Sequence, residues 1–94
     1  MFKAELQSNG DIKLTGRFDA SQVEAAKEVF DSVTKSCDVD FTNLDYISSA
    51  GLSVLLFTQK RLSKSGDSLK LMNLNKHIRD VFRYAGFDTV FEIS

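Results

Sequence analysis

Two neighbouring hydroxyl groups, on Ser48 and Ser49, stand where a strand-like run of residues gives way to a helix-like apolar run, and Gly51 follows them. In the first turn of a helix several backbone N–H groups lack partners and the helix dipole is positive, which favours anions. A serine there can act as a plain helix cap. It can also be a phosphorylation site, because the added phosphate carries about −1.5 to −2 charges and accepts hydrogen bonds from those N–H groups. The residues alone leave both roles open, and Gly51 would let another part of the backbone approach closely.

The other reactive residues form no catalytic or metal-binding pattern. Cys37 and His77 are the only cysteine and the only histidine, and they lie far apart in the sequence without the spacing of metal ligands. The chain has no phosphate-binding glycine-rich loop and no Gly-x-Ser-x-Gly motif. Asp19, Asp40 and Asp45 lie near predicted strand ends, where they could meet around a metal, but such residues more often form turns and caps. We expect no enzyme activity, no cofactor and no metal ion.

The first elements follow from alternating apolar and polar residues. Residues 2–7 and 12–15 alternate, and Asn9-Gly10 between them predicts a β-hairpin with a tight turn. Ser21, with Glu24 three residues later, forms a capping box that predicts a helix over residues 22–34. A strand is then expected from residue 37 to about residue 44.

The helix after Ser48-Ser49 carries apolar residues on two sides. The side chains that share its main apolar face are Leu52, Leu55, Leu56 and Leu62. Gly66 is suited to end this helix. Val54 and Phe57 project from the opposite side, where they either pack on a neighbouring helix or form an exposed apolar surface for a partner.

The remaining sequence completes an α/β pattern. Residues 68–74 predict a strand, and Asn75 is suited to cap a third helix. Residues 89–93 predict a short terminal strand or an extended tail over the core. The order β-β-α-β-α-β-α-(β) predicts a mixed β-sheet of four to five strands with three main α-helices. We expect residues 1–94 to form a single domain, since 94 residues suffice for one core.

The charge distribution and hydropathy exclude two function classes. Residues 1–59 hold five Lys/Arg against nine Asp/Glu, and residues 60–83 hold seven against two. These basic residues are dispersed without interleaved exposed aromatics, so we interpret them as a solvated face and expect no nucleic-acid binding. No apolar run approaches the ~20 residues that span a bilayer, and no signal peptide is visible. We therefore expect no membrane insertion and a cytoplasmic location.

The run Asp-Phe-Thr-Asn-Leu-Asp-Tyr-Ile-Ser-Ser-Ala-Gly-Leu, residues 40–52, resembles the signature of the STAS domain, specifically of stand-alone bacterial anti-sigma factor antagonists. Residues 14–20 look like the second strand of that family and the turn into its first helix. Residues 69–74 and 81–87 look like its later strand, last helix and closing turn. The resemblance therefore extends along essentially the whole chain and implies a STAS-like domain.

The resemblance also implies a mechanism. In that family an anti-sigma factor serine kinase phosphorylates the serine two positions before the glycine of the motif, here Ser49, and a metal-dependent serine phosphatase of the PP2C type removes the phosphate. The unphosphorylated antagonist binds the anti-sigma factor, which then releases its sigma factor. In this sequence Ser48 replaces the usual Asp and Ala50 replaces a second hydroxyl residue, so Ser48 stays open as an alternative acceptor.

The expected function is thus that of a non-catalytic anti-sigma factor antagonist switched by phosphorylation of Ser49. The residues expected to contact the partner are Asp19, Asp45, Ser48, Ala50, Gly51, Val54 and Phe57. The alternative is a STAS subunit that is never phosphorylated and serves as a scaffold in a signalling or lipid-transport complex, with Ser49 acting only as a cap. The sequence leaves open which kinase, phosphatase and sigma factor take part and what the oligomeric state is.

Overall fold

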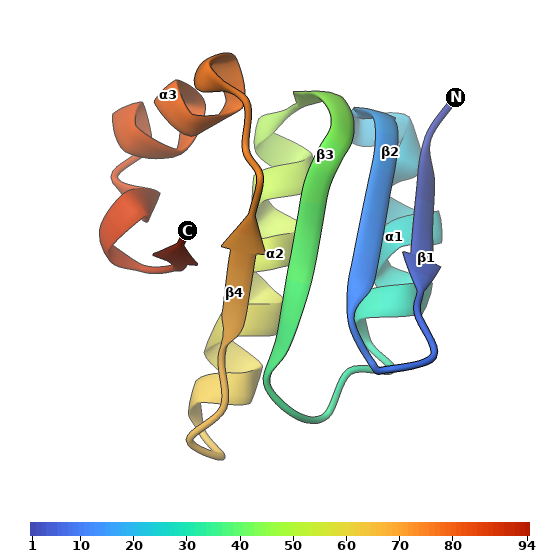
Figure 1. The fold of residues 1–94 in the computed structure, drawn as a ribbon, viewed down its shortest axis with the longest axis vertical. Coiled ribbons are helices and arrows are strands. Elements are labelled where there is room, and N and C mark those ends of the chain that lie inside the picture. Colours follow the sequence, from blue (N-terminus) through green and yellow to red (C-terminus); the bar gives the residue numbers. More distant parts are fainter.

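A computed structural model describes all residues from Met1 to Ser94 (Figure 1). The strands are β1 (Lys3–Leu6), β2 (Ile12–Phe18), β3 (Cys37–Ile47), β4 (Leu69–Met72) and β5 (Glu92–Ile93). The α-helices are α1 (Val23–Phe30), α2 (Ser49–Ser63) and α3 (Lys76–Tyr84), and two short 3₁₀ helices are η1 (Ala20–Gln22) and η2 (Phe87–Thr89). This order confirms the predicted α/β fold with five strands and three main helices.

The strands form one mixed sheet in the order β1-β2-β3-β4-β5. β1 pairs antiparallel with β2, and the other neighbours pair in parallel. α1 and α2 lie side by side behind the sheet, and α3 lies beside the end of β4 (Figure 1). None of the helices combines the length and the apolar character that crossing a bilayer requires.

The core lies between the sheet and its helices. Alternate residues of β2 point inward, and Phe18 at its end is fully buried. Phe82 of α3 is also fully buried, and the centre of its ring lies 6.0 Å from that of Phe41 on β3 and 5.7 Å from that of Phe91. Both pairs meet edge to face, the arrangement that aromatic rings favour. Phe82 therefore attaches α3 to the sheet.

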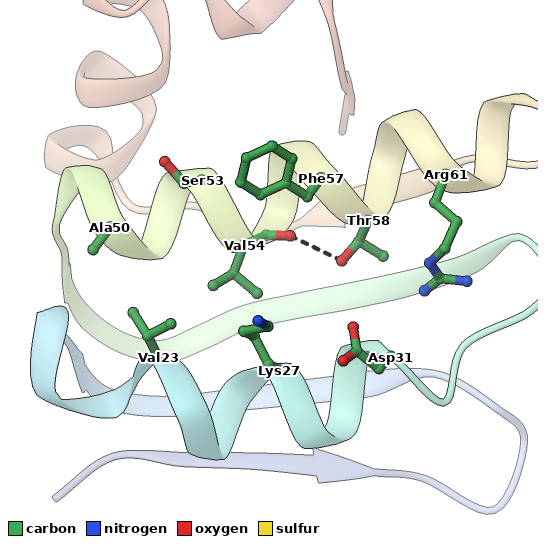
Figure 2. Close-up of a pocket in the computed structure, with 9 residues that line it drawn as sticks. All are labelled: Val23, Lys27, Asp31, Ala50, Ser53, Val54, Phe57, Thr58 and Arg61. Atoms are coloured by element: carbon green, nitrogen blue, oxygen red, sulfur yellow. Dashed lines mark hydrogen bonds between the residues drawn. The ribbon is translucent and has the colours of Figure 1, made fainter.

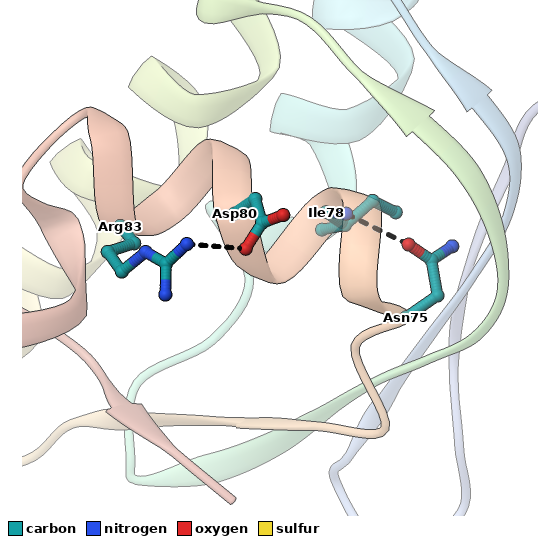
Figure 3. Close-up of polar contacts among 4 residues, drawn as sticks. All are labelled: Asn75, Ile78, Asp80 and Arg83. Atoms are coloured by element: carbon teal, nitrogen blue, oxygen red, sulfur yellow. Dashed lines mark hydrogen bonds and ion pairs between the residues drawn. The ribbon is translucent and has the colours of Figure 1, made fainter.

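Asn75 begins α3, as the sequence predicted. Its side-chain Oδ1 accepts a 2.8 Å hydrogen bond from the Ile78 N–H, which Figure 3 shows. The Asn75 Nδ2 also donates to the Leu44 carbonyl at 3.4 Å, so this cap connects α3 to β3. Further along the helix, Arg83 and Asp80 form an ion pair of 3.0 Å (Figure 3).

The first helix differs from its prediction in length and cap. The expected helix over residues 22–34 is replaced by η1 and the shorter α1, which ends at Phe30. The predicted capping box of Ser21 and Glu24 is wrong, because Asp19 accepts hydrogen bonds from the Ser21 N–H at 3.1 Å and from the Ser21 hydroxyl at 2.6 Å. An aspartate directly before a turn readily accepts hydrogen bonds from the residue two positions later.

β3 is longer than the sequence predicted, since it continues past residue 44 to Ile47. Its pairing with β2 shifts twice: Lys13 and Thr15 pair with Asp40 and Asn43, and Gly16 and Arg17 pair with Leu44 and Tyr46. Each shift inserts one extra residue into β3, which is the geometry of a β-bulge. The bulges interrupt the alternation of apolar and polar residues that marks a strand. The sequence therefore predicted that the strand ends near residue 44, before its true end at Ile47. They also return Leu44 and Ile47 to the buried face.

The hairpin between β1 and β2 is confirmed, but its turn is wider than predicted. The Gly10 N–H donates to the Gln7 carbonyl at 3.0 Å, and the Gln7 N–H donates to the Asp11 carbonyl at 2.7 Å. Gly10 has φ +93°, and Asn9 has no positive φ. This combination is a turn followed by one left-handed residue, so only Gly10 requires the conformation that glycine favours.

Asp40 should make the stability of the protein sensitive to acid. Partial burial by itself raises the pKa of Asp40, but hydrogen bonds from Thr42 and Asn73, together with the nearby Lys13, hold that pKa below its ordinary value of 3.8. A carboxyl group whose folded-state pKa is lowered stabilises the fold above its unfolded pKa and loses this contribution as the pH falls through the folded value.

We therefore expect the melting temperature of the wild type to exceed that of Asp40→Asn at about pH 6, and the difference to shrink towards about pH 2.5. Thermal unfolding followed by circular dichroism measures both values. Asp45→Asn is the matched control, because Asp45 is exposed and its side chain makes no hydrogen bond. A difference that grows in acid would contradict this role of Asp40.

Candidate functional site

The junction between β3 and α2 separates the two serines into different roles. Ser48 has extended backbone angles, φ −89° and ψ 170°, and its hydroxyl accepts a 3.2 Å hydrogen bond from the Gly51 N–H. It is therefore the N-cap of α2. The Ser48 N–H donates to the Phe18 carbonyl at 2.9 Å, which ties the start of α2 to the end of β2.

Ser49 is the first residue of α2, and its side chain is exposed. Its hydroxyl takes part in none of the side-chain hydrogen bonds of the chain; only its carbonyl is used, accepting a 3.1 Å bond from the Ser53 hydroxyl. The first turn of α2 contains no acidic residue. An anion on Ser49 would thus lie at the positive end of a 15-residue helix without a competing carboxylate in that turn.

Gly51 lies buried beneath these serines. A Cβ atom at Gly51 would lie 2.9 Å from Ile47 Cγ1 and 3.0 Å from both the ring and the carbonyl oxygen of Phe18. This confirms the close backbone approach expected at the glycine. The atoms of Gly51 are covered by residues of β2 and β3. Its lack of a side chain lets the start of α2 lie close to these strands.

Asp19 and Asp45 occupy the ends of neighbouring strands. Asp19 follows β2 and is half-buried, with Ser21 as its hydrogen-bond partner. Asp45 is exposed near the end of β3 and forms no ion pair. Next to it, the Arg17 guanidinium lies 4.3 Å from the centre of the Tyr46 ring, a cation–π contact across β2 and β3.

A groove runs between α1 and α2 from the Ser49 end, and we call it the α1–α2 groove (Figure 2). Its volume is about 510 Å³. The residues on the α1 side are Val23, Lys27 and Asp31. The residues on α2 are Ala50, Ser53, Val54, Phe57, Thr58 and Arg61. Ala50 and Ser53 both follow Ser49 on α2, so the groove begins near the start of that helix, and Ser49 itself is not part of the lining.

The structure confirms packing on a neighbouring helix for Val54 and exposure for Phe57, and a partner contact of Phe57 stays a prediction. Val54 is only 6% exposed and points towards α1, where it packs in the core (Figure 2). Phe57 is 68% exposed at the rim of the groove. Helix periodicity places both on one side of α2, but only the position of α1 decides which is covered.

Arg61 holds the far end of the groove together. Its two terminal nitrogens donate to the Val33 carbonyl at 2.7 Å and to the Phe30 carbonyl at 2.9 Å. Cationic side chains stabilise the unpaired carbonyl groups at a helix C-terminus. Arg61 therefore fixes the end of α1 against α2. Its role was missed from the sequence, because nothing in residues 52–64 indicates that α1 lies beside them.

No three His, Cys, Asp or Glu side chains come together as ligands for a metal ion. Asp19, Asp40 and Asp45 therefore do not form the cluster that the metal alternative requires. Cys37 is buried, and burial, followed by the charges of Asp11 and Asp38, raises the pKa of its thiol to about 11. Such a thiol stays protonated near neutral pH and is a poor nucleophile.

The sequence model of a protein family described as "Mlab, STAS domain" matches residues 1–92 of this chain. The chain belongs to the STAS-domain family. This confirms the resemblance carried by residues 40–52, and it agrees with the five-stranded mixed sheet and its three main helices.

The STAS domain is similar to proteins described as anti-sigma factor antagonists. It is 40% identical over 78 residues to BtrV of Bordetella bronchiseptica, described as a candidate anti-sigma factor antagonist, and the match covers 81% of this chain. The same match covers 66% of BtrV, slightly less than two thirds of its length.

Solved structures share its fold. SpoIIAA in its unphosphorylated form has a TM-score of 0.76 at 18% identity, covering 100% of this chain and 88% of SpoIIAA. The phosphorylated form from Bacillus has a TM-score of 0.71 at 18% identity, covering 100% of this chain and 91% of that one. A candidate antagonist from Thermotoga maritima has a TM-score of 0.79 at 20% identity, covering 99% and 85%.

Proposed function

We propose that this STAS domain, comprising residues 1–94, is a non-catalytic anti-sigma factor antagonist whose binding to an anti-sigma factor serine kinase is switched by phosphorylation of Ser49. The proposal rests on the different environments of the two serine hydroxyls. The Ser48 hydroxyl is occupied as the helix cap, whereas the Ser49 hydroxyl is exposed and has no hydrogen-bond partner within the chain. Phosphorylation of Ser49 would leave the hydrogen bond of the Ser48 cap untouched.

The relatives support the same reading. BtrV is described as a candidate anti-sigma factor antagonist, and SpoIIAA has been solved in both a phosphorylated and an unphosphorylated form. We propose that a serine phosphatase of the PP2C type reverses the modification here. The cytoplasmic location expected from the sequence remains a prediction.

The proposed partner surface is made of residues with two kinds of role. The residues are Asp19, Asp45, Ser48, Ala50, Gly51, Val54 and Phe57. Ala50 and Phe57 offer atoms at the surface, whereas Gly51 and Val54 act from beneath by holding α2 in place. A dianion on Ser49 in the middle of this surface would have to lose its hydration when a partner covers it, which opposes binding.

Incubation with a candidate anti-sigma factor serine kinase tests the proposal. The protein is incubated with that kinase and ATP, its intact mass is measured, and the modified peptide is sequenced by tandem mass spectrometry. We expect one phosphoryl group, located on Ser49, and none in Ser49→Ala. Phosphate on Ser48 alone would overturn the assignment of Ser49. No phosphate on either serine would favour the alternative of an unphosphorylated scaffold subunit.

A further inference from the structure

We propose that strand β1 pairs with the β1 strand of a second copy of this chain. The two strands run antiparallel and meet at Ala4, so that two five-stranded sheets join into one continuous sheet. This inference goes beyond the proposed function and does not depend on it. The helix that carries Ser49, α2, lies behind β3 and β4 and leaves the β1 edge uncovered (Figure 1).

The edge strand β1 presents a row of backbone groups that no other strand uses. The Gln7 N–H donates to the Asp11 carbonyl just before β2, so Gln7 directs its backbone groups towards the neighbouring strand. Residues of an antiparallel strand alternate between those that bond across the pair and those that do not. The backbone groups of Ala4 and Leu6 therefore point outward. Since no strand lies beyond β1 in the sheet, these groups can receive an added strand.

The charges of β1 complement each other when two copies meet at Ala4. On the face of the sheet turned away from α1 and α2, Lys3 lies opposite Glu5 of the second copy, and the two-fold symmetry repeats this pair. Opposite charges that face each other directly stabilise antiparallel strands. Neither Lys3 nor Glu5 forms an ion pair within the chain, although Lys13 is the cross-strand neighbour of Glu5.

These charges also select one register. A shift of the centre by one residue would place Lys3 opposite Lys3 or Glu5 opposite Glu5, and like charges in this position are destabilising. Charged side chains often protect an edge strand from pairing. In β1 they oppose the shifted registers and favour the one centred on Ala4.

The other side of β1 provides apolar contacts in the same register. Leu6 pairs with the buried Ile12 and so points towards the helices, yet its side chain is 54% exposed. Alternate residues of a strand share a face, so Phe2, Ala4 and Leu6 lie together on this side. Pairing about Ala4 brings Phe2 of one copy opposite Leu6 of the other. The exposed apolar surface of Leu6 would then be removed from water, which favours association.

The helix layer has room for the second copy. In Figure 1 α1 lies behind β1 and β2, and α2 lies behind β3 and β4, so each of these helices covers two strands. Two strand spacings amount to about 9.5 Å, within the roughly 8–10 Å at which helices pack. The α1 helices of the two copies can therefore lie side by side. Helix periodicity places the uncharged Ala25 and Val29 on that side, opposite Val23 and Lys27, which line the α1–α2 groove.

Charge-swap variants test both the pairing and its register. Sedimentation velocity should show the wild type forming dimers as its concentration rises from about 10 μM to about 1 mM, the range of weak complexes. Lys3→Glu and Glu5→Lys should each weaken the dimer at least about tenfold, because each places like charges opposite each other twice. The combined variant should restore the dimer. A mixture of the two single variants should form mixed dimers.

A backbone variant and a distant charge change complete the test. Ala4→Pro removes an outward N–H without removing a bond to β2, so it should abolish the dimer while circular dichroism shows an intact fold. Lys64→Glu makes the same charge change as Lys3→Glu at the exposed end of α2, and it should leave the dimer unchanged. In the wild type, hydrogen exchange of the Ala4 and Leu6 amides should slow as the protein concentration rises.

Three results would overturn the proposal. The first is a wild type that stays monomeric at about 1 mM. The second is a combined charge-swap variant that dimerises no better than the single variants, since this register requires the restored pairs. The third is concentration-dependent protection confined to amides outside β1. Failure of Ser49 phosphorylation would change none of these measurements, so the two proposals fail independently.

Discussion

Phosphorylation of Ser49 is expected to weaken binding to the anti-sigma factor kinase about a hundredfold, which corresponds to a loss of ~3 kcal/mol. The phosphate brings about −1.5 to −2 charges to an exposed hydroxyl that a bound partner would cover, and this charge must lose its hydration on binding. Ser49→Asp carries a smaller charge, and we expect it to weaken binding about tenfold. Ser49→Ala should bind like the unmodified protein and accept no phosphate there.

Isothermal titration calorimetry with the purified kinase measures these affinities. Ser65→Asp is the matched control, because it adds the same charge at an exposed serine just beyond the other end of α2. Its affinity should stay within about twofold of the wild type, as expected for a distant exposed charge. Equal weakening by Ser49→Asp and Ser65→Asp would mean that overall charge, and not the site, controls binding.

Gly51→Ala should destabilise the protein by about 1–3 kcal/mol, although alanine favours a helix over glycine by about 1 kcal/mol. The added methyl group would lie 3.0 Å from the Phe18 carbonyl oxygen and 2.9 Å from Ile47 Cγ1, closer than carbon atoms pack. The start of α2 must therefore move away from β2 and β3. Because Ser48 and Ser49 lie in the same turn, we also expect slower phosphorylation of Ser49.

Urea unfolding measures the loss of stability, and the kinase reaction measures the loss of phosphorylation. Ser53→Ala is a suitable control for stability, because this exposed position on the same helix accepts a better helix former without crowding the core. A Gly51→Ala protein as stable as the wild type would show that α2 adjusts without strain. It would also remove the reason to expect slower phosphorylation.

Much of the fold follows from local patterns that a single sequence contains. The alternation in residues 12–15, the apolar face of Leu52, Leu55 and Leu62, and the cap at Asn75 all correspond to elements of the structure. Each of these patterns involves residues close in the chain, so a single sequence contains it. The length of β3 was not predictable in this way, because the bulges near Thr42 and Asp45 arise from its pairing with β2.

Some features of the candidate site also follow from the sequence alone, and others depend on tertiary packing. Residue types and spacing alone determined that two serines stand at a strand-to-helix junction and that a glycine follows, because helix caps and close-approach glycines have local signatures. Tertiary structure decided that the Ser48 N–H pairs with the Phe18 carbonyl, that Val54 is covered, and that Phe57 is exposed. It also brought Lys27 of α1 beside α2. The physical reason is that burial and pairing depend on which distant segment packs against a residue, and the local sequence does not contain that information.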